Sequence, residues 1–294
     1  MSVSFSSKTV LVTGASSGIG YQAALDFARN GAFIIGAGRD PERCRQAADA
    51  IRQAVPGAGV EFLVADLASQ QQVRSLAEQA LSLLSSHGIA HLDVLVNNAG
   101  LYSSAKRMTE DEIELTFAVN HLAPFLLTHL LLPALSASPD ARILNLSSES
   151  HYHSMFNPVN MNNPRFYVGI FAYATSNLSR VLFSAEFNRR VPFANLHAWA
   201  VDPGLVNTEI GLKDKGFLSN LVWKSRKTHG TSADAPSRTI LLLALAALNE
   251  ISNDLYWKDC RPKLSSRASR NPDLARLLWE RSCALCGIEN YFTG

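Results

Sequence analysis

The chain has 294 residues, of which 47% are hydrophobic and 18% are charged. A chain of this length can bury a large apolar core, so disorder, a collagen-like fibre and a small disulfide scaffold are excluded. Its 27 Lys and Arg residues nearly balance its 25 Asp and Glu residues, which leaves a net charge of +2. This balance argues against a protein that coats nucleic acid, and we expect no nucleic-acid partner.

The chain shows no targeting or membrane-spanning pattern. Its N-terminus lacks the charged start and apolar run of a signal peptide. The most apolar stretches, 122–135 and 240–248, fall short of the ~18 uninterrupted apolar residues that span a bilayer. Cys283 and Cys286 are spaced C-x-x-C, but no second pair of ligands completes a zinc site. We therefore predict a cytoplasmic protein without a metal.

Short apolar runs alternate with helical patterns along the chain. Strands are predicted at 9–13, 32–37, 60–65, 91–97, 142–147 and 196–201. Helices are predicted at 21–29, 40–54, 69–85, 110–135 and 171–189. This alternation predicts an α/β fold, a Rossmann-type doubly wound parallel sheet of about seven strands with helices on both faces. We expect one domain over 1–294, with a substrate lid at about 205–235 and a C-terminal extension over 249–294.

The first predicted strand leads directly into a glycine-rich turn, T-G-A-S-S-G-I-G at 13–20. Small residues let the backbone approach a pyrophosphate, and the helix that follows offers free N–H groups to it. The spacing differs from the strict G-x-G-x-x-G, but a position between strand and helix favours dinucleotide binding. We expect the cofactor to contact Gly14, Ser16, Ser17, Gly18, Ile19 and Gly20.

The end of the second predicted strand distinguishes between the two nicotinamide cofactors. An NAD site usually places an acidic residue there to bind the ribose hydroxyls, whereas this chain has Arg39. Because a guanidinium pairs bidentately with phosphate, Arg39 favours the 2′-phosphate of NADP(H). After the third strand, Asp66 and Leu67 are expected to face the adenine.

Motifs in a fixed order resemble the short-chain dehydrogenase/reductase family. They are the turn at 13–20, N-N-A-G at 97–100, Asn120, the pair Ser147-Ser148, Tyr173, and Pro203-Gly204 followed by Thr208. The segments 256–260 and 278–283 are similar to the retinol-dehydrogenase-like branch. The resemblance runs from about residue 8 to residue 288.

The resemblance implies a Ser–Tyr pair that handles the substrate oxygen. In reduction, Tyr173 would donate its proton to a carbonyl oxygen that Ser148, preferred over Ser147, positions. Asn120 would hold a water that joins the site to solvent. The resemblance also implies cofactor contacts for Asn97, Ala99, Gly100, Pro203, Gly204, Val206 and Thr208.

One position departs from the family pattern Y-x-x-x-K, because the chain has Asn177 four residues after Tyr173. Residues i and i+4 share a helix face, so Asn177 takes the place of the lysine and can hydrogen-bond a nicotinamide ribose without supplying charge. A cation favours the ionised form of a neighbouring phenol. Its absence favours reduction, which needs a neutral phenol, over oxidation. Arg180 lies seven residues after Tyr173 on roughly the same helix face and is a candidate to substitute for the lysine. Because it is two turns away, we favour a structural or surface role for it.

The predicted substrate side is apolar. The residues expected to line the pocket are Tyr102, His151, Met155, Phe156, Phe217, Leu221 and Trp223. A lipophilic carbonyl compound or alcohol fits such a pocket. The basic, amphipathic stretch 216–227 is also compatible with contact at a membrane surface. The resemblance implies subunit pairing through 111–135 and 69–85, as in a homodimer or tetramer.

We therefore predict an NADP(H)-dependent enzyme that reduces a ketone or aldehyde of a lipophilic small molecule, slowly or in a specialised way. Asn177 leaves two alternatives open. One is a redox-neutral cyclase or isomerase, and the other is a cofactor-binding protein without catalysis. Retention of Asn120, Ser148 and Tyr173 together favours an enzyme.

Overall fold

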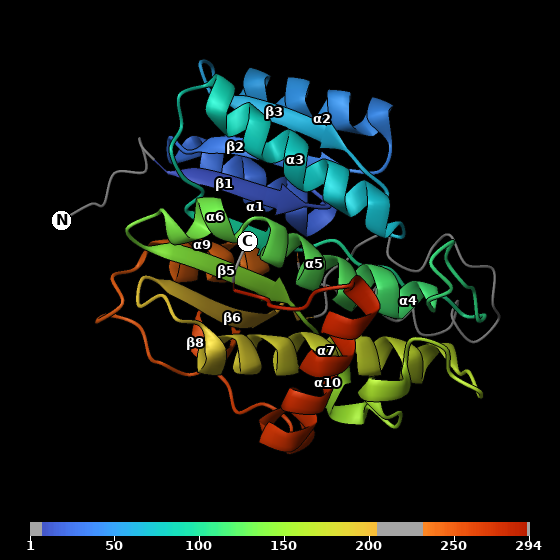
Figure 1. Cartoon of the computed structure of the whole chain (residues 1–294). Helices are drawn as coiled ribbons and strands as arrows, with labels where there is room; N and C mark the ends of the chain where they lie inside the picture. The colour runs from blue at the N-terminus through green and yellow to red at the C-terminus, as the bar shows by residue number, and fades with distance from the viewer. Residues whose placement is uncertain (1–7, 205–231, 293–294) are drawn as a thin grey trace.

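A single eight-stranded sheet forms the centre of the molecule (Figure 1). The computed structural model describes residues 8–204 and 232–292. The strand order is β3-β2-β1-β4-β5-β6-β7-β8, parallel throughout except for the last pair. The strands are β1 (Thr9–Thr13), β2 (Phe33–Gly38), β3 (Val60–Val64), β4 (Val94–Asn97), β5 (Ala141–Leu146), β6 (Leu196–Asp202), β7 (Tyr256–Lys258) and β8 (Arg261–Pro262). The predicted doubly wound parallel sheet is thus confirmed, with eight strands.

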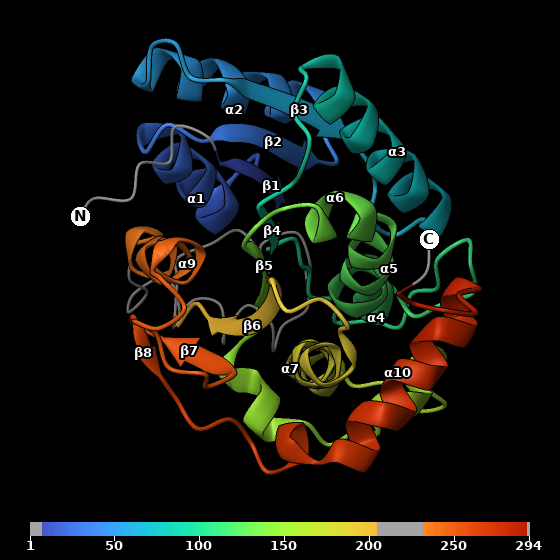
Figure 2. The same cartoon turned by 60° about the vertical axis from the view of Figure 1, so that its left-hand side comes forward.

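Helices cover both faces of the sheet, as Figure 2 shows. One face carries α1 (Gly18–Arg29), α2 (Pro41–Ala54) and α9 (Asp234–Leu245). The other carries α3 (Gln70–Ser86), α5 (Ala123–Leu130) and α7 (Gly169–Arg190). Every residue of β1 and β5 is buried, as expected of central parallel strands that are covered on both sides.

The helix predicted over 110–135 begins later, at Leu115, and is interrupted at Leu131. The chain there forms α4 (Leu115–Phe117), a π-helical turn η1 (Ala118–Leu122), α5 and α6 (Leu132–Ser136). The side chain of Glu114 accepts hydrogen bonds from the first N–H groups of α4 and so starts it. The backbone stays helical through η1 into α5, and the break comes at Leu131, with a φ of −93° and a ψ of 0°. Pro133 then lies in the first turn of α6, where its missing N–H costs no helical bond.

The C-terminal segment is part of the core. Strands β7 and β8 extend the sheet, and α10 (Pro272–Cys286) lies against the outer side of α7 (Figure 2). Leu278 and Trp279 of α10 are buried in the same core as α7, and the Tyr291 hydroxyl donates to the Phe125 carbonyl at 2.7 Å. Short helices η2 (Glu149–His153), η3 (Pro158–Asn160) and η4 (Ala268–Arg270) complete the described structure. None of its helices combines the length and apolar character needed to cross a membrane.

Candidate functional site

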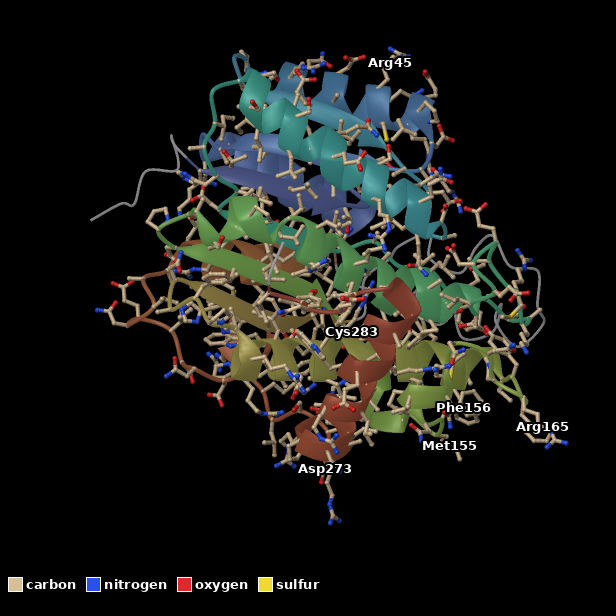
Figure 3. The ribbon with its side chains drawn as sticks, in the orientation of Figure 1. Arg45, Met155, Phe156, Arg165, Asp273 and Cys283 are labelled. Carbon is tan, nitrogen blue, oxygen red and sulfur yellow. The ribbon has the colours of Figure 1, made fainter. Side chains whose placement is uncertain are left out.

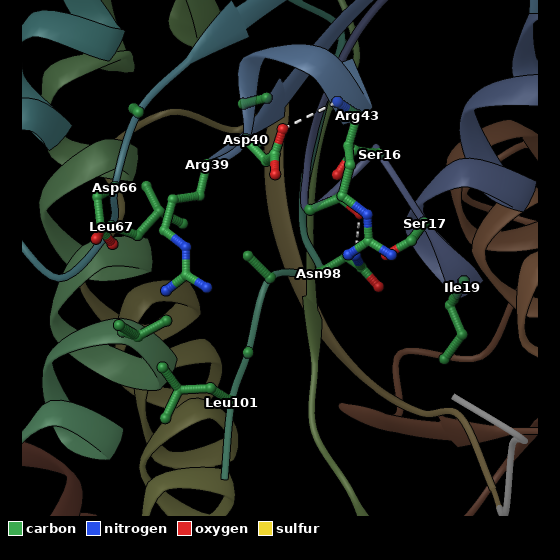
Figure 4. Close-up of a pocket in the computed structure, with 18 of the residues that line it drawn as sticks. Ser16, Ser17, Ile19, Arg39, Asp40, Arg43, Asp66, Leu67, Asn98 and Leu101 are labelled. Carbon is green, nitrogen blue, oxygen red and sulfur yellow. Dashed lines mark hydrogen bonds between the residues drawn. The ribbon is translucent and has the colours of Figure 1, made fainter. Parts of the chain in front are cut away.

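A cleft of about 430 Å³ opens where β1, β2, β3 and β4 end (Figure 4). In parallel α/β sheets, ligands bind beyond the carboxyl ends of the strands, where the strand order reverses; here that is between β1 and β4. The cleft brings together residues that lie far apart in the sequence. Of the predicted site residues, those that line it are Gly14, Ser16, Ser17, Gly18, Ile19, Arg39, Asp66, Leu67, Ala99, Gly100 and Tyr102.

The glycine-rich turn has the backbone shape that a pyrophosphate requires. Gly14 has a φ of +68°, which side chains disfavour. A Cβ on Gly20 would lie 2.3 Å from the Gly14 carbonyl oxygen, so only glycine fits there. Ser17 occupies the N-cap of α1, yet its side chain caps no N–H group. The first N–H groups of α1 are therefore left for an anionic ligand.

Two arginines reach into the cleft from the start of α2. Figure 4 shows Arg39 extending toward the side of Leu67 and Arg43 toward the side of Ser17. Asp40 caps α2 by accepting from the Arg43 N–H at 3.1 Å, which fixes this turn. The sequence analysis missed Arg43, although its i+4 spacing from Arg39 could have indicated it. These two guanidinium groups give this end of the cleft a positive charge, which favours an anionic group.

Asn97 does not line the cleft, which corrects its predicted cofactor role. Its side chain is fully buried, and its Nδ2 donates to Asn145 Oδ1 at 2.8 Å. Successive side chains at a strand end face opposite ways, so the next residue takes the place at the cleft. Asn98 lines it, and its Nδ2 donates to the Thr13 carbonyl at 2.8 Å, which ties the glycine turn to β4.

Of the predicted Ser–Tyr pair, Ser148 follows β5 as the N-cap of η2, and Tyr173 lies on α7. Tyr173 is half-buried near the start of α7, and its ring meets that of Tyr102 edge-on with centroids 6.1 Å apart. Ser147 donates its hydroxyl to the Asn177 carbonyl at 3.0 Å and is thereby committed to the helix. Ser148 Oγ accepts from the Ser150 N–H at 3.2 Å, which leaves its own hydrogen to donate to a substrate oxygen. Ser148 is the better candidate of the two.

Asn177 is buried and bonded within the protein. Its Nδ2 donates to the Tyr173 carbonyl at 2.9 Å and to Ser150 Oγ at 3.2 Å. These bonds use both amide hydrogens, so only the side-chain oxygen could meet a ribose. Asn177 thus joins α7 to the segment that follows Ser148.

Asn120 stands in the π-helical turn η1, a distortion that often marks functional sites. Its amide forms a two-way pair with Leu101, donating to the carbonyl at 2.9 Å and accepting from the N–H at 2.8 Å. Its Nδ2 also donates to Ser176 Oγ at 2.9 Å, and its backbone carbonyl accepts from Arg180. These contacts occupy the groups that the implied water would use.

The structure places His151 in a structural role rather than in a pocket. The imidazole is buried, its Nδ1 bonds the Ser148 carbonyl at 2.8 Å, and its Nε2 accepts from the Ser266 N–H at 3.1 Å. Burial lowers the pKa of His151, in keeping with this neutral form. Because both ring nitrogens are used, the expectation that it contacts substrate is wrong.

Met155 and Phe156 lie outside the described cleft, beyond η2 (Figure 3). The Met155 side chain is 72% exposed. Phe156 packs edge-on against Phe171 with ring centroids 5.9 Å apart. A substrate pocket that included Met155 and Phe156 would have to be lined by residues other than those of this cleft.

The remaining predicted residues follow β6. Pro203 and Gly204 are described, and Gly204 turns the chain with a φ of +69°. Outside the described residues lie Val206, Thr208, Phe217, Leu221 and Trp223, with most of the predicted lid. No cluster of His, Cys, Asp and Glu within 8–204 and 232–292 could hold a metal.

Fold and cleft define a nucleotide-dependent enzyme of the Rossmann type. Residues 8–215 match the family model described as short chain dehydrogenase, and the chain belongs to this family.

Among its relatives, "Retinol dehydrogenase 12" of Mus musculus is 35% identical over 282 residues, which cover 96% of this chain and 87% of the relative. A solved structure of an uncharacterised Mycobacterium paratuberculosis protein is 30% identical with a TM-score of 0.74, covering 97% of this chain and 96% of that one. A metagenomic short-chain oxidoreductase in complex with NADP is 25% identical with a TM-score of 0.61, covering 89% of this chain and all of that one. The predicted retinol-dehydrogenase-like branch is confirmed.

Proposed function

We propose that this protein is an NADP(H)-dependent oxidoreductase that reduces the carbonyl group of a lipophilic small molecule to an alcohol. The observation that carries the proposal is the glycine-turn cleft with Arg39 and Arg43 at its adenosine end and Tyr102, beside Tyr173, at its other end. A protein that only bound a nucleotide would need no tyrosine and serine hydroxyls beyond the cleft.

Arg39 and Arg43 support NADP(H) over NAD(H). No acidic side chain lies at the end of β2 to accept from the ribose hydroxyls, because residue 39 is arginine and Asp40 is engaged as the cap of α2. Charge-assisted bonds from two guanidinium groups would hold the 2′-phosphate, and the free N–H groups of α1 would hold the pyrophosphate.

When bound, the reduced nicotinamide supplies a hydride to the carbonyl carbon. The Tyr173 hydroxyl would donate its proton to the carbonyl oxygen, and the Ser148 hydroxyl would hold that oxygen by a hydrogen bond. The products are an alcohol and the oxidised cofactor, so hydride and proton are both accounted for.

A lipophilic substrate is supported by the relatives named retinol dehydrogenases and by the apolar residues at the open end of the cleft, Leu101 and Tyr102. Retinaldehyde and other apolar aldehydes and ketones are the class that we propose. A polar or charged carbonyl compound would bind less well, because its polar groups would lose water and contact these apolar side chains instead.

The test is NADPH consumption by the purified protein with a panel of apolar and polar carbonyl compounds, measured together with alcohol formation. We expect one alcohol per NADPH consumed, with apolar substrates preferred and NADH used less efficiently. NADPH binding without consumption for any compound in the panel would overturn the proposal.

A further inference from the structure

Arg180 is a buried arginine of α7 that holds three chain segments together. Its side chain is 4% exposed. The guanidinium donates to the carbonyls of Asn120 in η1, Leu146 at the end of β5 and Ala99 in the loop after β4. Ala99 lines the cofactor cleft, and Leu146 precedes the two serines. One side chain thus joins the cofactor loop, the serine-bearing strand end and α7 itself.

The local sequence leaves two of these carbonyls in need of a donor. In an α-helix the N–H of residue 124 would bond the carbonyl of residue 120, but Pro124 has no N–H to donate. Strand β4 pairs with β5 only as far as Asn97 opposite Asn145, so the Leu146 carbonyl extends beyond it. Arg180 supplies the missing donors.

The charge of Arg180 lies directly behind the cleft. A Cβ on Gly100, which lines the cleft, would be 3.4 Å and 3.5 Å from the two terminal nitrogens of the guanidinium. Among the described residues no carboxylate forms an ion pair with Arg180. The other buried arginine of the sheet region, Arg142, differs in this respect, since it pairs with Asp140 at 2.7 Å. The charge of Arg180 is therefore not cancelled by a local anion.

This charge acts on its surroundings. Burial lowers the pKa of Arg180 to about 10, and attraction to the Tyr173 hydroxyl in its ionised form opposes that shift. The side chain therefore stays charged at neutral pH. Burial, with repulsion from Arg180 as a second cause, lowers the pKa of His121 to about 3.

We propose that Arg180 is a positioning residue that supplies, from beneath the site, the positive charge that Asn177 does not. Residues seven apart on a helix point within about 20° of one another, and helix side chains lean toward the N-terminus. Arg180 therefore leans back along α7 toward Tyr173. The guanidinium favours the ionised Tyr173 that oxidation requires and that reduction forms. This inference rests on the proposed function for its catalytic meaning.

The test measures deprotonation of Tyr173 in the NADP⁺-bound protein. Ultraviolet difference absorbance of each protein against the same protein with Tyr173→Phe isolates this one phenol. The neutral variant is Arg180→Gln, the charge-retaining variant is Arg180→Lys, and the double variant Asn177→Lys/Arg180→Gln moves the charge one turn closer. Arg142→Met is the matched control, because it removes a buried arginine at the opposite end of β5.

We expect Arg180→Gln to raise the midpoint pH of Tyr173 deprotonation, because it removes the cation that favours the ionised phenol. Arg180→Lys and the double variant should stay near the wild-type midpoint, and Arg142→Met should lower stability without moving it. An unmoved midpoint in Arg180→Gln would overturn the inference. If that variant does not fold, the neutral variant Arg180→Met decides, with Arg142→Met as its matched control: a raised midpoint supports the charge role, and an unmoved midpoint contradicts it.

This readout needs no turnover, so it separates the inference from the proposed function. A shifted midpoint in a protein that reduces no carbonyl compound would uphold the role of Arg180 on Tyr173 and refute the reductase. Turnover with an unmoved midpoint would do the opposite.

Discussion

The two ends of the site are built on different principles. At the glycine turn, the shape of the cleft is set by the backbone: Gly14 and Gly20 keep the turn tight, and α1 leaves its first N–H groups free. At the end that holds Tyr173, the arrangement depends on side chains, with Asn177 and Arg180 on one face of α7.

This difference indicates which positions of the family pattern can be replaced by another residue. A glycine that accepts no Cβ cannot be exchanged without moving the backbone. A charge acts over several ångströms, so its source can move along a helix while the reacting hydroxyl stays in place. The chain keeps the glycine turn and, in our account, supplies its cation from Arg180.

Loss of the Tyr173 hydroxyl is the largest expected effect at the reacting end. Tyr173→Phe should lower the rate of reduction by about 10²- to 10⁴-fold, because the positioned proton donor is removed. Steady-state kinetics measure the rate of reduction, and NADPH titration measures the affinity for the cofactor. We expect that affinity to be unchanged. Tyr291→Phe is the control, since it deletes a hydroxyl that bonds the Phe125 carbonyl in the core. A Tyr173→Phe variant as fast as the wild type would refute the assignment.

Substitutions at the adenosine end should change the affinity for the cofactor and not the rate of reduction. We expect Arg39→Ala with Arg43→Ala to weaken NADPH binding by about 10- to 100-fold, since charge-assisted bonds are worth about 1.5–3 kcal/mol, and to leave NADH binding nearly unchanged. Arg45→Ala is the matched control on the same helix, because Arg45 pairs with Glu42 and Asp49 on the exposed side (Figure 3). Equal losses for NADPH and NADH would contradict a 2′-phosphate site.

Restoring the lysine of the family pattern sharpens the comparison. Asn177→Lys should change the rate of alcohol oxidation by less than about tenfold, because Arg180 already supplies a cation and the variant loses the bonds to Tyr173 and Ser150. The rates of alcohol oxidation and carbonyl reduction are measured for the wild type and for Asn177→Lys, with Asn177→Gln as the uncharged control. A gain well beyond tenfold in oxidation would mean that Tyr173 lacks a charge in the natural chain.

The smallest expected effect concerns Glu149, the residue that follows Ser148. Glu149 bonds Lys258 at 2.8 Å and Lys263 at 2.5 Å, and these bonds lower the pKa of its carboxyl to about 2. A lowered folded-state pKa contributes stability above the unfolded value of about 4.5, and that stability is lost as pH falls toward 2. The pair is partly exposed, so the contribution stays below about 1 kcal/mol.

Denaturant unfolding checks this effect across acid pH. Glu149→Gln should be slightly less stable than the wild type at pH 7, and the difference should shrink below about pH 4.5 and vanish only near pH 2. Glu61→Gln, near Arg52 on the surface, serves as the control. A difference between wild type and Glu149→Gln that persists unchanged into acid would contradict the assignment.

The sequence predicts well those features that depend on local pattern. Alternating apolar runs predicted the parallel sheet, and of the glycines in the turn at 13–20 the structure places Gly14 and Gly18, but not Gly20, along the cleft. The helix predicted over 110–135 begins at Leu115 and breaks at Leu131, and the apolar pattern marks neither point. The spacing of apolar residues indicates which face of a helix is buried, but it is less informative about where the helix begins and ends.

The side-chain contacts of the site depend on packing that no local pattern contains. Asn97 and Asn98 are adjacent and identical in type, and only the direction in which β4 ends decides which faces the cleft. Arg180 looked like a structural or surface residue because it lies two turns from Tyr173. The carbonyl groups that bind it come from three distant segments, and residue 124, a proline, has no N–H to offer the Asn120 carbonyl.

The most direct test of the central claim is the fate of the hydride. NADPH carrying deuterium at carbon 4 of the nicotinamide, on one face or the other, is incubated with the protein and the best apolar carbonyl compound, and the product is analysed by mass spectrometry. We predict an alcohol with one deuterium on the carbinol carbon from one of the two labelled cofactors. A product without deuterium from either, or an isomer formed while NADPH is unchanged, would contradict the reductase.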